Sequence, residues 1–197
     1  MATPPPLYAG IGARKTPIDA LAIMREVGLR LAEQGWTLRT GGAQGADQAF
    51  LEGCLRAAPR VELMLPWPGF NGHQRAWQGQ PHRHAYEIAA AHHPAWQRCS
   101  EAAKHLLARN VHVLLGADLA TPVSMVVAWT PSGRLDGGTG HALRVAEAFG
   151  ITEVRNLAAM PDRMRIMRFV GQPRLGEIPY PCPPEPFDDD APAAQAA

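Results

Sequence analysis

Residues 40–47, Thr-Gly-Gly-Ala-Gln-Gly-Ala-Asp, decide the fold that this chain is expected to adopt. They follow the apolar, strand-like run 36–40 and open a helix-like run. A second glycine-rich turn, Asp-Gly-Gly-Thr-Gly-His at residues 136–141, has the same position after the apolar run 122–129. Glycine lets the backbone approach a ligand closely, and the helix that follows offers unpaired N–H groups and a positive dipole end. Two such turns predict one phosphate- or anion-binding site at the carboxyl edge of a parallel sheet.

The composition is that of a single compact domain. The 197 residues suffice for one buried core, and 46% of them are hydrophobic. No apolar run reaches the length of about 18 residues that spans a bilayer, and the first residues do not resemble a signal peptide. The three cysteines, Cys54, Cys99 and Cys182, are widely spaced, which favours free thiols over a disulfide framework or a zinc knuckle. We therefore expect a cytoplasmic protein without a membrane partner.

Strand-like and helix-like runs alternate along the chain. The strand-like runs are residues 7–11, 36–40, 61–65, 123–129 and 151–156, and the helix-like runs are 17–34, 47–55, 101–115, 140–149 and 161–170. This order predicts an α/β fold with a doubly wound, mostly parallel, Rossmann-like sheet and helices on both faces. Residues 66–100 are expected to leave the sheet as a partly helical excursion. One domain is expected over residues 1–178, and the Pro, Asp and Ala content predicts a disordered tail at 179–197.

Three motifs in this order resemble those of the SLOG superfamily. They are residues 9–17 (AGIGARKTP), the first glycine turn with Asp47, and Trp129-Thr130-Pro131 followed by residues 137–140. The superfamily joins the DprA/Smf DNA-processing proteins, the Lonely Guy (LOG) cytokinin-activating phosphoribohydrolases and sensor domains that bind ADP-ribose-like nucleotides. The resemblance covers residues 7–157 and is nearest to small stand-alone DprA-like proteins of phages and mobile elements. It implies a Rossmann-like domain of the SLOG type, but it leaves enzyme, DNA binder and sensor open.

The candidate phosphate-binding residues lie in these motifs. They are Gly12, Arg14, Lys15, Thr16, Gly41, Gly42, Ala43, Gln44, Gly45, Asp47, Pro131, Gly137, Gly138, Thr139, Gly140 and His141. The superfamily places a Gly-Ser-Arg turn over a phosphate, and here Ala13 replaces the serine before Arg14. An arginine fork at that position suits phosphate oxygens, although the alternative is a surface arginine at the start of a helix. Asp47 is expected either to bind a ribose hydroxyl or to cap its helix.

A second set of residues is a candidate for base or ribose contacts: Trp67, Phe70, Asn71, Arg109, Asn110 and Arg144. Aromatic side chains beside a phosphate site either stack on a base or form a small core that pins the excursion to the sheet. The histidines of the excursion lack the regular spacing of metal ligands, so no metal site is predicted.

Whether the chain is an enzyme depends on Arg144. In LOG phosphoribohydrolases the second glycine loop reads Gly-Gly-x-Gly-Thr-x-x-Glu, and its glutamate assists cleavage of the N-glycosidic bond. Alignment on Gly137 puts His141 at the threonine position and Arg144 at the glutamate position. An arginine cannot act as the acid or base, although it can steady an anion. Catalysis is therefore not the expected function, and no cofactor is required.

Three functions remain. The main hypothesis is non-catalytic binding of a nucleotide or nucleotide derivative, of the ADP-ribose-like or cyclic signalling kind, by a sensor or sequestering protein. The alternatives are DprA-like binding of single-stranded DNA in recombination and LOG-like hydrolysis of nucleoside monophosphates. The formal net charge of +1 favours the first, because a DNA-binding track normally shows clustered Lys and Arg residues. We also expect the chain to form a homo-oligomer.

Overall fold

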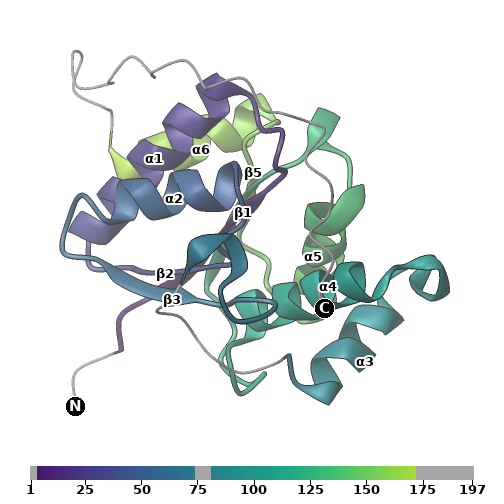
Figure 1. Cartoon of the computed structure of the whole chain (residues 1–197). Coiled ribbons are helices and arrows are strands. Elements are labelled where there is room, and N and C mark those ends of the chain that lie inside the picture. Colours follow the sequence, from purple (N-terminus) through teal and green to yellow (C-terminus); the bar gives the residue numbers. More distant parts are fainter. Residues whose placement is uncertain (1–3, 74–80, 172–197) are drawn as a thin grey trace.

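Figure 1 shows the computed structural model of the chain, which describes residues 4–73 and 81–171. Within these ranges the strands are β1 (Leu7–Gly12), β2 (Thr37–Thr40), β3 (Arg60–Leu63), β4 (Met125–Trp129) and β5 (Val154–Asn156). The α-helices are α1 (Ile18–Glu33), α2 (Ala46–Cys54), α3 (Arg83–Ala91), α4 (Glu101–Leu115), α5 (Gly137–Ala148) and α6 (Met160–Val170). Short 3-10 turns form η1 (Phe70–Gly72), η2 (Trp96–Arg98) and η3 (Pro131–Gly133). No helix in these ranges is long and apolar enough to cross a membrane.

The sheet has the strand order β3-β2-β1-β4-β5, and every neighbouring pair is parallel. The chain moves outward from β1 to β3, then returns across the sheet and continues from β4 to β5. This reversal places β1 and β4 side by side at the centre, with Gly12 in register with Trp129. The carboxyl ends of these two strands therefore form the switch point where ligands bind in open α/β sheets.

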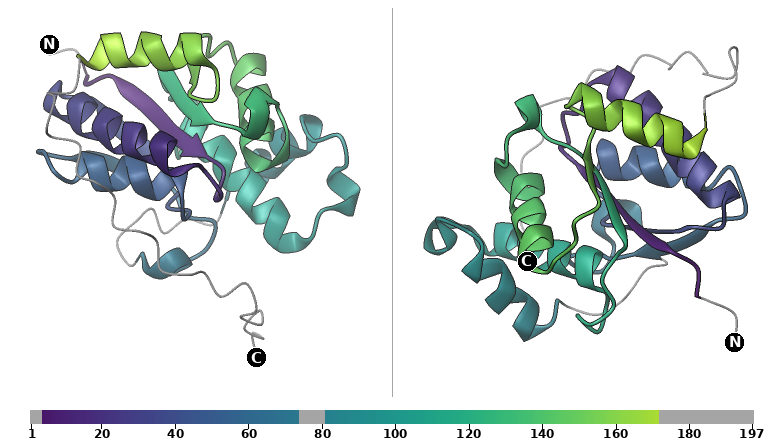
Figure 2. Two further views of the ribbon diagram at one scale, coloured as in Figure 1. Left: turned by 90° about the horizontal axis from the view of Figure 1, so that it is seen from above. Right: turned by 180° about the vertical axis from the view of Figure 1, so that it is seen from behind.

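Helices cover both faces of the sheet (Figure 2). Helices α1, α2 and α6 pack on one face against Tyr8 and Val127, while α4 and α5 pack on the other against Ala9 and Val126. Neighbouring residues of one strand thus face two different apolar cores. This explains why the strands are continuously apolar rather than alternating. Helix α3 packs against α4 and extends the second layer outward.

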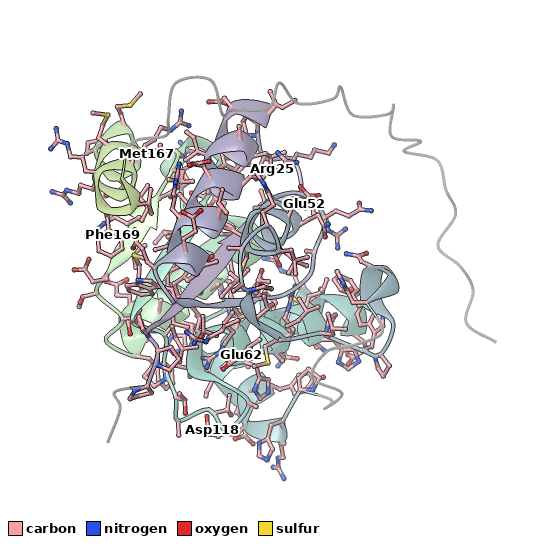
Figure 3. All side chains as sticks on the ribbon, turned by 90° about the vertical axis from the view of Figure 1, so that its left-hand side faces the viewer. Arg25, Glu52, Glu62, Asp118, Met167 and Phe169 are labelled. Atoms are coloured by element: carbon pink, nitrogen blue, oxygen red, sulfur yellow. The ribbon has the colours of Figure 1, made fainter. Side chains whose placement is uncertain are left out.

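Helices α1 and α2 cross closely because glycine replaces a side chain at their contact. A Cβ atom on Gly53 would lie 1.9 Å from the carbonyl oxygen of Arg25, and one on Gly28 would lie 2.4 Å from that of Phe50. On the outer surface Arg25 donates to Glu52 at 2.7 Å (Figure 3). At the other end of α2, a Cβ atom on Gly12 would lie 2.5 Å from the Cβ atom of Ala46, so the start of α2 lies close to the end of β1.

The predicted α/β class and doubly wound sheet are confirmed, and α3 provides the helical part expected in the excursion. Several boundaries differ from the sequence prediction by one to three residues, and β5, for example, covers Val154–Asn156 rather than 151–156. Helix α5 begins at Gly137 rather than Gly140, so that the second glycine turn is the first turn of the helix itself. The predicted disordered tail at 179–197 and the end of the domain at 178 lie outside the described residues.

Candidate functional site

A cavity of about 390 Å3 opens at the switch point between β1 and β4. Its lining comes from the segments after β1, β2 and β4 and from one face of α4. The lining residues are Ile11, Gly12, Ala13, Arg14, Ala43, Asp47, Leu106, Arg109, Asn110, Pro131, Asp136, Gly137, Gly138 and Thr139. The two glycine turns are therefore at the same edge of the sheet, as their sequence positions predict.

The amino end of α5 lines this cavity, and its first backbone N–H groups have no acceptor among the residues that the structure describes. Asp136 is the N-cap residue, but its side chain makes no capping hydrogen bond. The first helical bond runs from the Gly140 N–H to the Asp136 carbonyl, so the amides of residues 137–139 have no acceptor within the helix. Asn110 of α4 donates its side-chain amide to the Gly138 carbonyl at 3.3 Å. The open N–H groups and the positive helix end favour an anion at this point, whereas the Asp136 carboxylate opposes it.

Gly140 is required for the backbone path that brings α5 to the cavity. A Cβ atom at this position would lie 1.9 Å from the carbonyl carbon of Leu135. Any side chain would therefore push the preceding loop away from the helix. The glycine-rich composition of this turn thus serves close backbone packing as well as access for a ligand.

The first glycine turn is built differently, because its amides point to a protein side chain. The Asp47 carboxylate accepts the N–H of Gly41 at 3.2 Å and that of Ala43 at 3.3 Å. Asp47 is buried in the first turn of α2. Asp47 was expected either to bind a ribose hydroxyl or to cap its helix. Its geometry is closer to capping, but the N–H groups that it accepts belong to the turn before the helix rather than to the helix itself. This turn therefore offers fewer free donors to a ligand than the sequence suggests.

Arg109 provides a buried positive charge on the floor of the cavity. Its Nη1 lies 3.5 Å from the Asp47 carboxylate, and the two side chains are 5% and 6% exposed. Burial lowers the pKa of Arg109, an effect that Asp47 opposes and the charge of nearby Arg14 reinforces. Burial likewise raises the pKa of Asp47, with Arg109 acting against it. The Nε atom of Arg109 has no hydrogen-bond partner among the residues that the structure describes.

Arg14 contributes a second guanidinium from the rim of the cavity, where it is exposed. The turn that carries it is fixed from both sides. The Thr16 hydroxyl donates to the Ala13 carbonyl at 2.7 Å, and the Arg14 carbonyl oxygen lies 2.4 Å from where a Cβ atom of Gly45 would be. Thr16 thus supports the turn with its hydroxyl, and Lys15 is exposed outside the lining.

Several predicted site residues do not reach the cavity. His141 is fully buried, and its Nε2 lies 2.9 Å from the Ala89 carbonyl oxygen. Arg144 donates to the carbonyls of His92 and Leu135, so that it ties α3 and the loop before α5 to the helix. The other predicted residues outside the lining, besides Lys15, are Thr16, Gly41, Gly42, Gln44, Gly45, Gly140, Trp67, Phe70 and Asn71.

Four lining residues were not predicted: Ile11, Ala13, Leu106 and Asp136. A sequence signal existed for two of them. Leu106 lies four residues before Asn110 and three before Arg109, which places all three on one face of a helix. Asp136 directly precedes the second glycine pair and thus belongs to the same turn.

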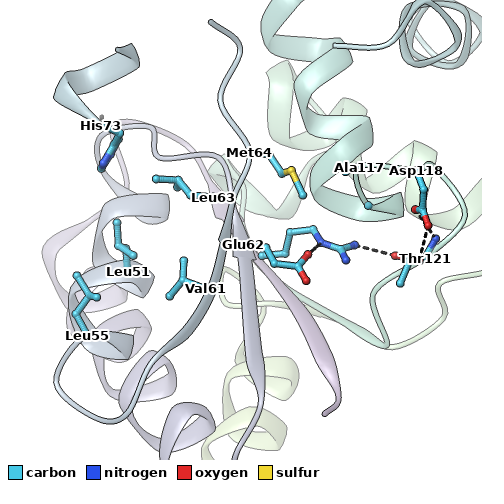
Figure 4. Close-up of a pocket in the computed structure, with 12 residues that line it drawn as sticks. Leu51, Leu55, Val61, Glu62, Leu63, Met64, His73, Ala117, Asp118 and Thr121 are labelled. Carbon is cyan, nitrogen blue, oxygen red and sulfur yellow. Dashed lines mark hydrogen bonds and ion pairs between the residues drawn. The ribbon is translucent and has the colours of Figure 1, made fainter. Parts of the chain in front are cut away.

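A second cavity, of about 770 Å3, lies at the edge strand β3 (Figure 4). Its charged groups are satisfied within the protein. Arg39 is 2% exposed and donates to Glu62 at 2.6 Å and to the Thr121 carbonyl at 2.8 Å. The Asp118 carboxylate accepts the amide and hydroxyl of Thr121. Although larger, this cavity has its arginine engaged by the protein, whereas the cavity at the switch point has the exposed Arg14 and the amino end of α5 in its lining.

Comparison with known proteins supports the fold. No family model matches the sequence, and no curated protein matches it. The structure is similar to the solved structure of DNA processing protein A from Helicobacter pylori, with a TM-score of 0.51 and 15% sequence identity over 84% of this chain and 80% of that chain. At this identity the likeness shows a DprA-like, Rossmann-like fold. The Helicobacter pylori protein itself binds single-stranded DNA, in a mode described as unique.

Proposed function

We propose that this protein binds single-stranded DNA and holds a backbone phosphate in the cavity between β1 and β4. The observation that carries the proposal is the convergence of the open α5 amino end with two guanidinium groups, Arg14 and Arg109. The fold likeness to a protein that binds single-stranded DNA supports this reading. It reverses the order of the sequence hypotheses, in which a nucleotide ligand came first.

Each group of the cavity has a distinct part in holding the phosphate. The amides at the start of α5 donate to its oxygens, as at other helix amino ends. Arg14 closes on the phosphate from the solvent side, where its side chain is free to adjust. Arg109 supplies charge from the buried side and is held in place by Asp47. Asp136 sits at the same helix end, and its charge limits the affinity for a free dianion.

The charge distribution sets the expected salt dependence. With a formal net charge of +1 and few cations around the cavity, the protein neutralises only about two or three phosphates. For a single strand this corresponds to a slope of about −1.4 to −2 in a plot of log affinity against log salt. The strand is thus held by one strong phosphate site and weaker neighbours rather than by a long basic track.

A compact nucleotide is the second candidate. The cavity volume of about 390 Å3 favours it, since it falls within the range of small-molecule pockets. The same phosphate chemistry serves both ligands, because a terminal phosphate of a nucleotide also suits the α5 amino end. What differs is the number of phosphates engaged at once.

The two candidates are separated by titration of the full chain at two salt concentrations. The probes are a labelled oligothymidylate of about 15 nucleotides, the corresponding duplex, AMP and ADP-ribose. We expect the single strand to bind with the salt slope given above and better than the duplex. Binding of a nucleotide alone, with no measurable binding of the single strand, would support the second candidate instead.

A further inference from the structure

A row of aromatic rings lies next to Arg109, outside the lining of the cavity. We call Trp67, Phe70, Tyr86 and His105 the aromatic shelf. The ring centroids of Trp67 and Phe70 are 5.1 Å apart, those of Trp67 and His105 are 6.5 Å apart, and those of Tyr86 and His105 are 5.6 Å apart. The Tyr86 hydroxyl is also hydrogen-bonded to Nδ1 of His105. The shelf therefore joins three separate segments: the turn after β3, helix α3 and helix α4.

The shelf is continuous with the floor of the cavity. The Arg109 guanidinium lies 5.8 Å from the Phe70 ring centroid. His105 is one helical turn before Arg109 on α4, so both belong to the same face of that helix. The shelf therefore meets the cavity at Arg109, through the buried ring of Phe70, and its partly exposed rings lie on the side of α4 that packs against α3.

The rings of the shelf are suited to contact a ligand. Phe70 is buried, but Trp67, Tyr86 and His105 are only partly buried. The three ring pairs meet edge to face, at interplanar angles of 86°, 67° and 73°. None of these contacts is a parallel stack, so the rings do not cover one another's faces. Partly exposed aromatic rings beside a phosphate site are the means by which proteins hold the bases of single strands.

We propose that the aromatic shelf is a base-stacking subsite for nucleotides adjacent to the phosphate in the cavity, with Trp67 as its principal ring. The inference rests on the proposed single-stranded DNA binding and adds the route of the strand, from the amino end of α5 across Arg109 toward α3. Tyr86 and His105 were not among the predicted site residues, and the proposal assigns them to this surface, where they extend it beyond Trp67 and support its ring.

The experiment compares two probes of about 15 nucleotides. One is oligothymidylate and the other is an abasic phosphodiester of the same length, which keeps the phosphates and removes the bases. The proteins are the wild type, Trp67→Leu, Trp67→Phe, His105→Ala and the control Trp36→Leu. Trp36 is a partly buried tryptophan on the opposite face of the sheet, in contact with Phe169 of α6. Thermal melting of each variant verifies that it is folded.

We expect the wild type to bind oligothymidylate more tightly than the abasic probe. Trp67→Leu should weaken oligothymidylate binding by roughly 5- to 150-fold, as loss of one base–aromatic stack does, and leave abasic binding within about twofold. Trp67→Phe should restore most of the loss, His105→Ala should reproduce part of it, and Trp36→Leu should change neither affinity.

Other outcomes overturn the inference in distinguishable ways. Equal wild-type affinity for the two probes would refute the stacking subsite and leave the phosphate site standing. An equal loss for both probes in Trp67→Leu, without rescue by Trp67→Phe, would show that the shelf only supports the fold. Failure of the wild type to bind either probe would refute the proposed function and the subsite together.

Discussion

Gly41 and Gly138 occupy similar places in the two glycine turns, but they lack a side chain for different reasons. A Cβ atom on Gly41 would lie 1.1 Å from Nη1 of Arg109, because the guanidinium packs directly over this backbone. The nearest atom to a Cβ on Gly138 is the Asn110 side-chain nitrogen at 3.9 Å. The first glycine therefore admits a buried protein charge, whereas the second leaves space in front of the α5 amino end.

Substitution of these two glycines by alanine should separate the roles. In Gly41→Ala the Arg109 guanidinium must move and its ion pair with Asp47 is disturbed. We expect the free energy of unfolding to fall by about 1–3 kcal/mol. Gly138→Ala, the matched control, should change it by less than about 0.5 kcal/mol. Urea denaturation measures both values, and equal effects of the two substitutions would contradict this account of the turns.

At the scale of elements, α5 decides the position of the site. Its amino end lines the cavity, while His141 and Arg144 farther along anchor it to the carbonyls of Ala89, His92 and Leu135. These three hydrogen bonds hold α3 and the loop before α5 against the helix. His141 and Arg144, which the sequence suggested as ligands, thus act one layer behind the cavity.

Element positions were largely predictable from the sequence, but the direction of hydrogen bonds was not. Apolar runs predict the strands, and the glycine turns after them predict the sheet edge at which the site lies. Both signals are local, because they depend on the spacing of apolar residues and on turn chemistry. The partner of Arg144 depends on where α3 returns to the sheet, which no local pattern specifies. The inward orientation of the first turn depends likewise on Asp47 and Arg109, which lie 62 residues apart.

His141 makes the attachment of α5 sensitive to pH. Burial is the main reason why the pKa of His141 is lowered to about 4, from about 6.5 in an unfolded chain. The unfolded chain therefore binds more protons between these values, so the stability present above pH 6.5 is lost as pH falls toward 4. The loss from pH 7 to pH 5 is about 2 kcal/mol for this residue. Burial lowers the pKa of His112 as well, which adds in the same direction.

The free energy of unfolding of the wild type and of His141→Gln, measured at pH 7 and pH 5, shows how much of this loss of stability is due to His141. Glutamine keeps a donor for the Ala89 carbonyl but does not titrate. We expect the variant to lose less stability on acidification than the wild type. Identical pH dependence of the two proteins would mean that His141 is not held in its neutral form.

On the scale of the whole molecule, the doubly wound sheet gathers the chemistry of distant segments at one edge. Loops after β1, β2 and β4 meet there, and α4 adds Arg109 and Asn110 from the side. The balance of charge over the chain is nearly neutral, so attraction to DNA is local rather than spread over a face. The expected homo-oligomer stays a prediction, which light scattering of the purified chain would test.

The same arrangement predicts little or no hydrolysis of nucleoside monophosphates. Arg144 stands at the position of the LOG glutamate and is bound to the carbonyls of His92 and Leu135. The Asp47 carboxylate is engaged by backbone N–H groups and Arg109. We expect no enzyme-like release of adenine from AMP. A turnover of roughly one per second that disappears in Asp136→Asn would instead identify a catalytic carboxylate in the cavity.

The central claim is that the cavity between β1 and β4 holds a phosphate of single-stranded DNA. Its most direct test is the affinity of the full chain for labelled oligothymidylate in the wild type, Arg14→Ala and Arg56→Ala. Arg56 is an exposed arginine that follows α2 and lies outside the cavity lining. We predict that Arg14→Ala weakens binding by about 1.5–3 kcal/mol, the loss of a charged hydrogen bond, while Arg56→Ala leaves it unchanged. Equal affinities of the wild type and Arg14→Ala, or equal losses in both variants, would contradict the account.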